Sequence, residues 1–235
     1  MKTMTLMGHF VELRRRILWT FLIFLGAFVL GWYVAPWGLT FITSPLLRVW
    51  PDGKLLYTGI TDGLMIRLSL SLVVGIIVTL PVGLWHLWAF ISPGLHANER
   101  RFIWPLMIAS PVLFIIGATF AFYFLFPFVF RFFIELNEST TVPTMIMPAA
   151  RDYLAFALRM LRVFGIAFQL PLIMVLLNRI GILSRGAAVA MRRYAFCGIV
   201  VIAAVLTPPD VVSQIMLAIP MCMLFEGGIL FMRRD

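Results

Sequence analysis

An isolated carboxylate between two long apolar runs is the first residue of this sequence that suggests chemistry. Glu99 is the only acidic residue between Asp62 and Glu135, and it is followed directly by Arg100 and Arg101. A carboxylate accepts two parallel hydrogen bonds from the planar fork of a guanidinium, and lysine cannot reproduce that arrangement. We therefore interpret Glu99 as a group that binds arginine side chains of another polypeptide.

Glu12 is a second acidic residue in a basic segment, and Arg14, Arg15 and Arg16 follow it. In a helix Glu12 would face Arg15 and Arg16 at i,i+3 and i,i+4 spacing, where an ion pair contributes about 0.2–0.5 kcal/mol. The arginines would also anchor the orientation of the chain in a membrane. These two roles, a local ion pair and a positive anchor, explain Arg15 well. They explain Glu12 less well, because an acidic residue does not help to anchor a positively charged segment.

Membrane-spanning helices must position these carboxylates, because 62% of the 235 residues are hydrophobic and only 12% are charged. Soluble domains carry about 25% charged residues, and each membrane crossing needs about 20 apolar residues. The pattern predicts an all-α polytopic membrane protein. We expect a single membrane domain, residues 1–235, with six transmembrane helices over residues 17–35, 64–90, 102–130, 153–178, 190–206 and 211–231.

The basic residues predict the orientation of these helices. Most of the 19 Lys and Arg residues lie in the segments that share one side with both termini. Short cytoplasmic loops carry such an excess, so we expect both termini inside, and we attribute the net charge of +9 to topology rather than to nucleic-acid binding. Prolines inside the apolar segments predict bent helices and a curved, kinked bundle: Pro81, Pro105, Pro111, Pro171 and Pro220.

The fifth apolar segment is short for a crossing. Residues 194–206 would cover about 20 Å as a helix, against a hydrocarbon core of about 30 Å. Three explanations stay open: the helix begins earlier, near Ala187, the bilayer is thinner there, or Arg192 and Arg193 snorkel to the interface.

No motif predicts an enzyme, a metal site or a cofactor. The sequence has no Gly-x-Ser-x-Gly, no His-Glu-x-x-His and no pair of aspartates in facing helices, which argues against an intramembrane protease. The three histidines, His9, His86 and His96, are not placed beside a nucleophile. Cys197 and Cys222 lie in apolar segments, where we expect them to act as packing residues.

A series of different short motifs extends along nearly the whole chain. They include Glu12-Leu13-Arg14, Trp88 to Leu95, Glu99-Arg100-Arg101, Phe120 to Phe124, Phe168-Gln169, Thr207-Pro208-Pro209-Asp210 and Phe225-Glu226. In order, spacing and expected topology they resemble the TatC family, the membrane receptor subunit of the twin-arginine protein translocase. Each motif alone is weak, but together they are specific.

The resemblance implies a site and partners. It implies that the carboxylates that recognise consecutive arginines of signal peptides are Glu12 and Glu99, with Arg14 and Arg16 in the same cytoplasmic surface. It also implies assembly with TatA- and TatB-like single-span proteins into a hetero-oligomer of the bacterial inner membrane. That complex would export folded proteins with energy from the proton-motive force.

Five further residues are candidates for contacts with partners or between helices: Gln169, Pro208, Pro209, Asp210 and Glu226. Gln169 lies deep in an apolar helix, where family members place Glu or Gln toward a partner, and we favour that role. The alternative is an interhelical hydrogen bond of about 0.6 kcal/mol. Asp210 is placed to cap the sixth helix, and Glu226 to pair with Arg233 or with a neighbouring helix.

A secondary transporter of small solutes, coupled to protons or ions, is the alternative function. Transporters carry charged or discontinuous helices at the membrane midplane and are often built from inverted repeats. Gln169 is the single feature that favours this alternative, and no convincing internal repeat appears.

Overall fold

The structure is a computed structural model that describes residues 6–91, 97–138, 147–207 and 211–233. Within these residues the regular elements are helices, and the expected all-α fold is confirmed. In chain order they are α1 (Leu6–Val49), α2 (Asp62–Ile91), α3 (Ala97–Phe120), a π-helical turn (Ala121–Leu125), α4 (Phe126–Glu138), α5 (Ala150–Ala167), α6 (Leu170–Arg179), α7 (Arg185–Ala190), α8 (Arg192–Leu206) and α9 (Val211–Phe231).

Five helical stretches of the described chain are long and apolar enough to cross a membrane. They are Phe10–Val49, Asp62–Leu87, Trp104–Asn137, Ala150–Arg179 and Gln214–Phe231. The remaining predicted crossing falls on α8, whose 15 residues cover about 22 Å at the usual helical rise. One of the three explanations was that this crossing begins earlier, near Ala187. The residues there instead form the separate helix α7, because the chain turns at Met191.

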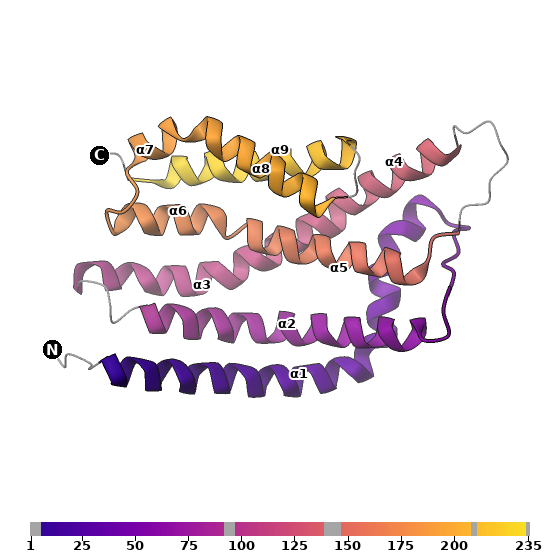
Figure 1. The fold of residues 1–235 in the computed structure, drawn as a ribbon, viewed down its shortest axis with the longest axis horizontal. Helices are drawn as coiled ribbons and strands as arrows, with labels where there is room; N and C mark the ends of the chain where they lie inside the picture. The colour runs from indigo at the N-terminus through magenta and orange to yellow at the C-terminus, as the bar shows by residue number, and fades with distance from the viewer. Residues whose placement is uncertain (1–5, 92–96, 139–146, 208–210, 234–235) are drawn as a thin grey trace. The chain divides into compact units, whose positions relative to one another are not determined.

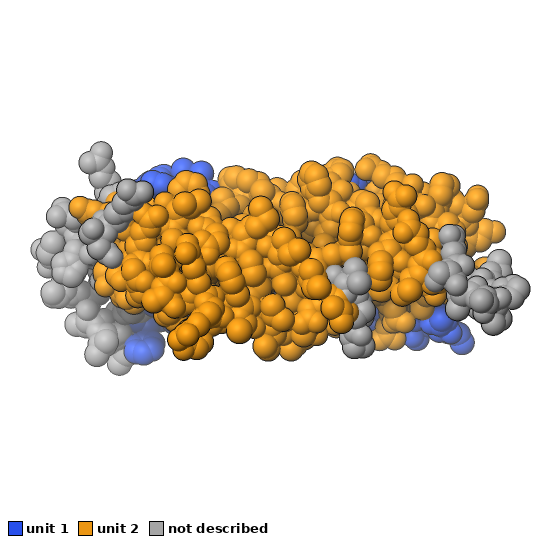
Figure 2. Space-filling view, turned by 90° about the horizontal axis from the view of Figure 1, so that it is seen from above, with its two compact units in different colours: residues 1–42, 57–111 blue, residues 43–56, 112–235 orange. Residues whose placement is uncertain are grey.

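The chain divides into two compact units, one of residues 1–42 and 57–111 and one of residues 43–56 and 112–235 (Figure 2). In the first unit α1 and α2 run antiparallel (Figure 1) and approach closely at Gly31. A Cβ atom there would lie 2.9 Å from both the Cα and the carbonyl oxygen of Ser71. Arg67 of α2 also bonds this partner helix, because its Nε donates to the carbonyl oxygen of Trp32 at 3.0 Å.

The first helix is longer than the sequence predicts. A helix was expected over residues 17–35, but α1 continues through Pro36 to Val49. A proline inside a helix removes one backbone hydrogen bond. The residues beyond it are well packed, since Thr43, Pro45 and Leu46 are buried, and this packing favours continuation of the helix.

The third predicted helix, residues 102–130, is also longer and contains a π-helical turn. Helical structure runs without a gap from Ala97 to Glu138. The N–H of Phe126 donates to the carbonyl oxygen of Ala121, five residues back, and the next residue, Pro127, has no N–H to donate. Such π-helical turns are an ordinary way for a helix to accommodate a local break in its hydrogen bonds.

The fourth predicted helix, residues 153–178, is two helices, α5 and α6. The break lies at Phe168–Gln169, just before Pro171, which has no N–H to donate back to Ala167. Near the break α5 packs tightly on α3, because a Cβ atom at Gly117 would lie 2.5 Å from the carbonyl oxygen of Phe164. A further cluster of the second unit joins α6, α7 and α9 through Met174, Ala188, Ile229 and Met232.

Candidate functional site

The acidic residue of α1 pairs with an arginine one helical turn later. Arg16 donates to Glu12 Oε1 from Nε, at 2.9 Å, and from Nη2. The expected i,i+4 pair is therefore present, and both side chains are partly buried, with 21% of Glu12 and 24% of Arg16 exposed. Arg14 and Arg15 are exposed, so the pair lies in a surface with net positive charge.

The second carboxylate oxygen of Glu12 lacks a hydrogen-bond donor. Glu12 Oε2 is buried and has no hydrogen-bond partner among the described residues. A buried carboxylate oxygen without a donor is unfavourable, because water no longer solvates it. The carboxylate therefore retains the capacity to accept another hydrogen bond.

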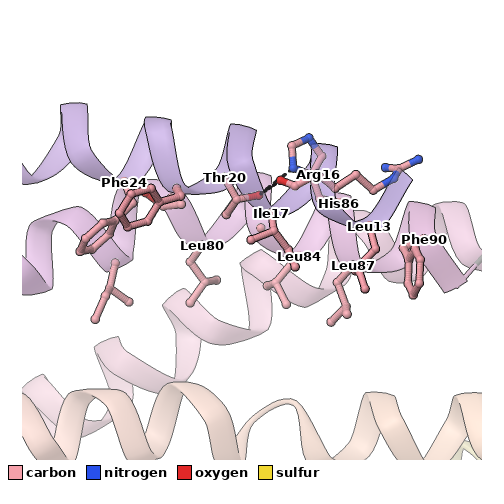
Figure 3. Close-up of a pocket in the computed structure, with 14 residues that line it drawn as sticks. Leu13, Arg16, Ile17, Thr20, Phe24, Leu80, Leu84, His86, Leu87 and Phe90 are labelled. Carbon is pink, nitrogen blue, oxygen red and sulfur yellow. Dashed lines mark hydrogen bonds between the residues drawn. The ribbon is translucent and has the colours of Figure 1, made fainter. Parts of the chain in front are cut away.

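A hydrogen-bonded pair of side chains connects this part of α1 to α2. The hydroxyl of Thr20 donates to the carbonyl oxygen of Arg16 at 2.8 Å, and it lies 2.8 Å from His86 Nδ1 (Figure 3). A hydroxyl has one hydrogen, so Nδ1–H of His86 is the donor in the second contact. The pair fixes the turn of α1 that carries Arg16 against the last turns of α2.

Two cavities meet at Arg16 and His86. The polar one has a volume of about 270 Å³ and is lined by Glu12, Arg15, Arg16, Trp19 and His86. The apolar one, about 600 Å³, runs between α1 and α2, and Arg16 and His86 line it as well. Its walls in Figure 3 are aliphatic and aromatic side chains, including Ile17, Phe24, Leu80, Leu84 and Leu87.

Trp19, exposed to 54%, gives the polar cavity an aromatic wall. A guanidinium stacks favourably on an indole face, and the carboxylate of Glu12 lines the same cavity. The arrangement is suited to an arginine side chain, which needs both a planar hydrogen-bond acceptor and a flat apolar surface.

Glu99, the other predicted carboxylate, lies in the first turn of α3, which begins at Ala97. Its side chain falls outside the described atoms. The start of α3 lies at the same end of the first unit as the start of α1. Thr20 of α1 contacts His86 at the end of α2, and neighbouring Trp85 packs edge-on against Trp104 of α3 at 5.4 Å.

The remaining predicted residues lie in the second unit. Gln169 is at the break between α5 and α6, where its carbonyl oxygen accepts from the N–H of Ile173 at 2.9 Å. Glu226 of α9 accepts from Arg192 Nη2 of α8 at 2.7 Å, so its partner is the neighbouring helix rather than Arg233. Pro208, Pro209 and Asp210 lie outside the described residues, and so does the cap predicted for Asp210.

The described part of the chain brings no three His, Cys, Asp or Glu residues together in a group able to hold a metal ion. The groups that the site does present are suited to ion pairing, hydrogen bonding and aromatic stacking.

The sequence singled out Glu12 and Arg16 but not the residues that complete the site. Trp19 lies three residues after Arg16 and Thr20 lies four after it, so helical spacing alone would have placed both near the pair. The contribution of His86 had no sequence signal, because 66 residues separate it from Thr20.

Comparison with known proteins gives one family. Residues 8–220 match the family model described as Sec-independent protein translocase protein (TatC). A relative from Haemophilus influenzae, named Sec-independent protein translocase protein TatC, is 39% identical over 230 residues, which are 97% of this chain and 88% of the relative. A relative of the same name from Escherichia coli is 36% identical over 232 residues, 98% of this chain and 89% of the relative.

Two solved structures have a similar fold. A crystal structure titled as the twin arginine translocase receptor TatC aligns with a TM-score of 0.84 at 31% identity, and covers 95% of this chain and 97% of that one. A second, of the same receptor in DDM, aligns with a TM-score of 0.86 at 31% identity, and covers 96% of this chain and 99% of that one.

Proposed function

We propose that this chain, which belongs to the TatC family of Sec-independent protein translocase proteins, binds twin-arginine signal peptides through the carboxylate of Glu12. Membership makes it a non-enzymatic, multi-pass component of the twin-arginine translocase in the bacterial inner membrane. It also decides against the alternatives of a secondary transporter and an intramembrane protease. The peptide, its binding residues and the partner subunits remain proposals.

The observation that supports this proposal most strongly is the state of Glu12. Its carboxylate is partly buried, lines a cavity beside an indole ring and keeps one oxygen without a donor. Hydrogen bonds between charged groups contribute about 1.5–3 kcal/mol. A guanidinium entering this cavity would supply the missing donor and stack on Trp19 at the same time.

Glu99 is the proposed partner of the second arginine. Its place in the first turn of α3, at the end of the first unit that carries Glu12, suits two carboxylates that engage two adjacent arginines. Arg14 and Arg16 belong to the same proposed surface, where positive charge repels a peptide that does not supply a good fit.

The experiment is equilibrium binding of a fluorescent twin-arginine peptide to the full chain in lipid nanodiscs. We expect Glu12→Gln to weaken binding about tenfold or more, because one charge-assisted acceptor is lost. Glu135→Gln is the matched control: Arg131 Nε donates to Glu135 Oε1 at 2.8 Å with the same i,i+4 spacing, and neither residue is among those that line the polar cavity. Equal affinity of the wild-type chain and Glu12→Gln would refute the proposal.

The proposed partners are TatA- and TatB-like single-span proteins in a hetero-oligomer. We propose that Gln169, at the break between α5 and α6, contacts such a helix, and that residues 208–210 and Glu226 contribute to contacts between helices. A photoreactive residue in place of Gln169 tests the first contact. Crosslinks to a coexpressed single-span partner support it, and their absence, with efficient crosslinking from neighbouring Ile166, rejects it.

A further inference from the structure

The pair formed by Glu12 and Arg16 uses the carboxylate unevenly. Both donors of Arg16 bond the same oxygen, Oε1, and Oε2 is buried without a partner among the described residues. A guanidinium and a carboxylate interact best through two parallel hydrogen bonds, one on each oxygen. Arg16 therefore holds Glu12 in an arrangement that another guanidinium can improve.

Arg16 also occupies the place that a visiting arginine needs. It lines the polar cavity together with Glu12, Trp19 and His86, and its two donors take the oxygen that such a visitor would share. Because both donors of Arg16 bond Oε1, a visitor cannot form the two-oxygen arrangement while the Arg16 side chain stays in place.

The backbone at Arg16 is fixed independently of its side chain. The hydroxyl of Thr20 bonds the carbonyl oxygen of Arg16, and His86 of α2 bonds that hydroxyl. The guanidinium can therefore leave Glu12 while this turn of α1 keeps its position. The Arg16 side chain can therefore change its position while the backbone of α1 at this point does not.

We propose that Arg16 is an internal competitor for Glu12, and that an incoming arginine binds by displacing the Arg16 guanidinium from the carboxylate. This inference rests on the proposed function and assigns Arg16 a role in setting how strongly a visitor must bind. An incoming arginine gives one hydrogen bond to each oxygen, so it offsets the two bonds that Arg16 gives up and supplies Oε2 with the donor it lacks. A lysine ammonium lacks the planar fork and does not offset them, so it binds weakly while Arg16 competes for the carboxylate.

The competitor model predicts the effect of removing Arg16 on affinity. In nanodiscs, the full chain is titrated with two peptides that differ only in having two arginines or two lysines. We expect Arg16→Gln to raise the affinity for both peptides by about tenfold, since each then meets an unoccupied carboxylate. Displacing Arg16 costs the same free energy for either peptide, so the affinity ratio between the two peptides stays the same.

Two further variants control for charge and for folding. Arg15→Gln removes the same charge from the neighbouring residue, which lines the same cavity but has no ion pair with the described residues, and should raise both affinities much less than Arg16→Gln does. Arg16→Lys keeps the charge but loses the planar fork, and we expect affinities between those of the wild-type chain and Arg16→Gln. It also tests the inference if Arg16→Gln fails to fold.

The outcomes separate this inference from the proposed function. If Glu12→Gln leaves arginine-peptide binding unchanged, the proposed function fails. If Glu12→Gln weakens binding but Arg16→Gln raises the two affinities no more than Arg15→Gln does, only the competitor role fails. A loss of affinity for both peptides in Arg16→Gln would likewise overturn it, because Arg16 would then be a contact for the peptide.

Discussion

An ion pair between Glu and Arg at i,i+4 spacing occurs twice in the described helices, once exposed and once partly buried. Arg131 and Glu135 leave 72% and 61% of their side chains exposed, whereas Arg16 and Glu12 leave 24% and 21%. Exposed pairs contribute little, because solvent screens them, and a buried carboxylate costs free energy unless it is fully hydrogen-bonded. Burial, rather than residue type, therefore distinguishes the pair of Glu12 and Arg16 from that of Arg131 and Glu135.

Trp19 allows the binding geometry to be tested at a single residue. If a guanidinium stacks on its indole, Trp19→Ala should weaken binding of a twin-arginine peptide by about two- to fivefold, given about 0.5–1 kcal/mol for such a contact at an exposed ring. The control is Trp37→Ala in the same helix, which removes an indole that is 73% exposed. Equal affinities of the two variants would show that Trp19 does not contact the peptide.

At the residue scale, the sequence predicted a contact within one helix but not the contact between residues that are far apart in the sequence. Glu12 and Arg16 were placed together because four residues make about one helical turn. The uneven use of the two carboxylate oxygens depends on rotamers, and the bond between Thr20 and His86 depends on the packing of α1 against α2. Neither follows from a pattern in the sequence.

The packing of α1 on α2 is the structural feature that holds the site at the scale of helices. At Gly31 a methyl group would meet the backbone of Ser71, and the backbone cannot give way as a flexible side chain can. At Gly26 of the same helix the corresponding space is open, with nothing within 4 Å. The two glycines therefore form a matched pair.

We expect Gly31→Ala to destabilise the protein by about 1–3 kcal/mol, because overpacking forces the two helices apart. Gly26→Ala should be neutral or slightly stabilising, since alanine favours helix more than glycine does. Thermal unfolding of the two purified variants in the same detergent compares them. A melting temperature for Gly31→Ala at or above that of Gly26→Ala would mean that the helices are not in close contact there.

Helix boundaries were the least predictable feature of the elements, and prolines are the reason. Pro36 does not end α1, whereas Pro171 lies just after the break between α5 and α6, and Pro127 follows a π-helical turn. The residue type is the same in each case. Packing around each proline decides whether the helix continues, changes its hydrogen-bond pattern or breaks, and a sequence pattern does not contain that information.

For the whole molecule, composition and motif order were sufficient to predict the class of protein. The apolar fraction predicted a membrane protein, and the ordered motifs predicted the TatC family. The orientation in the membrane still rests on the distribution of basic residues. We continue to predict that both termini face the cytoplasm and that α8 supplies the sixth crossing.

Single cysteines test this orientation in intact cells. With Cys197 and Cys222 replaced by serine, Glu135→Cys and Arg233→Cys each supply one exposed thiol for a membrane-impermeant maleimide. We expect labelling at position 135 and none at position 233 until the cells are opened. Labelling of position 233 alone in intact cells would reverse the topology and place Glu12 on the side away from the cytoplasm.

The central claim is that the carboxylate of Glu12 receives an arginine of the signal peptide, and a double-mutant cycle tests it most directly. The wild-type chain and Glu12→Gln, both in nanodiscs, are titrated with a twin-arginine peptide and with one carrying citrulline, which keeps the shape of arginine but not its charge. We expect citrulline to weaken binding to the wild-type chain about tenfold or more and binding to Glu12→Gln far less. An equal loss in both would contradict the claim, because the arginines would then be recognised elsewhere.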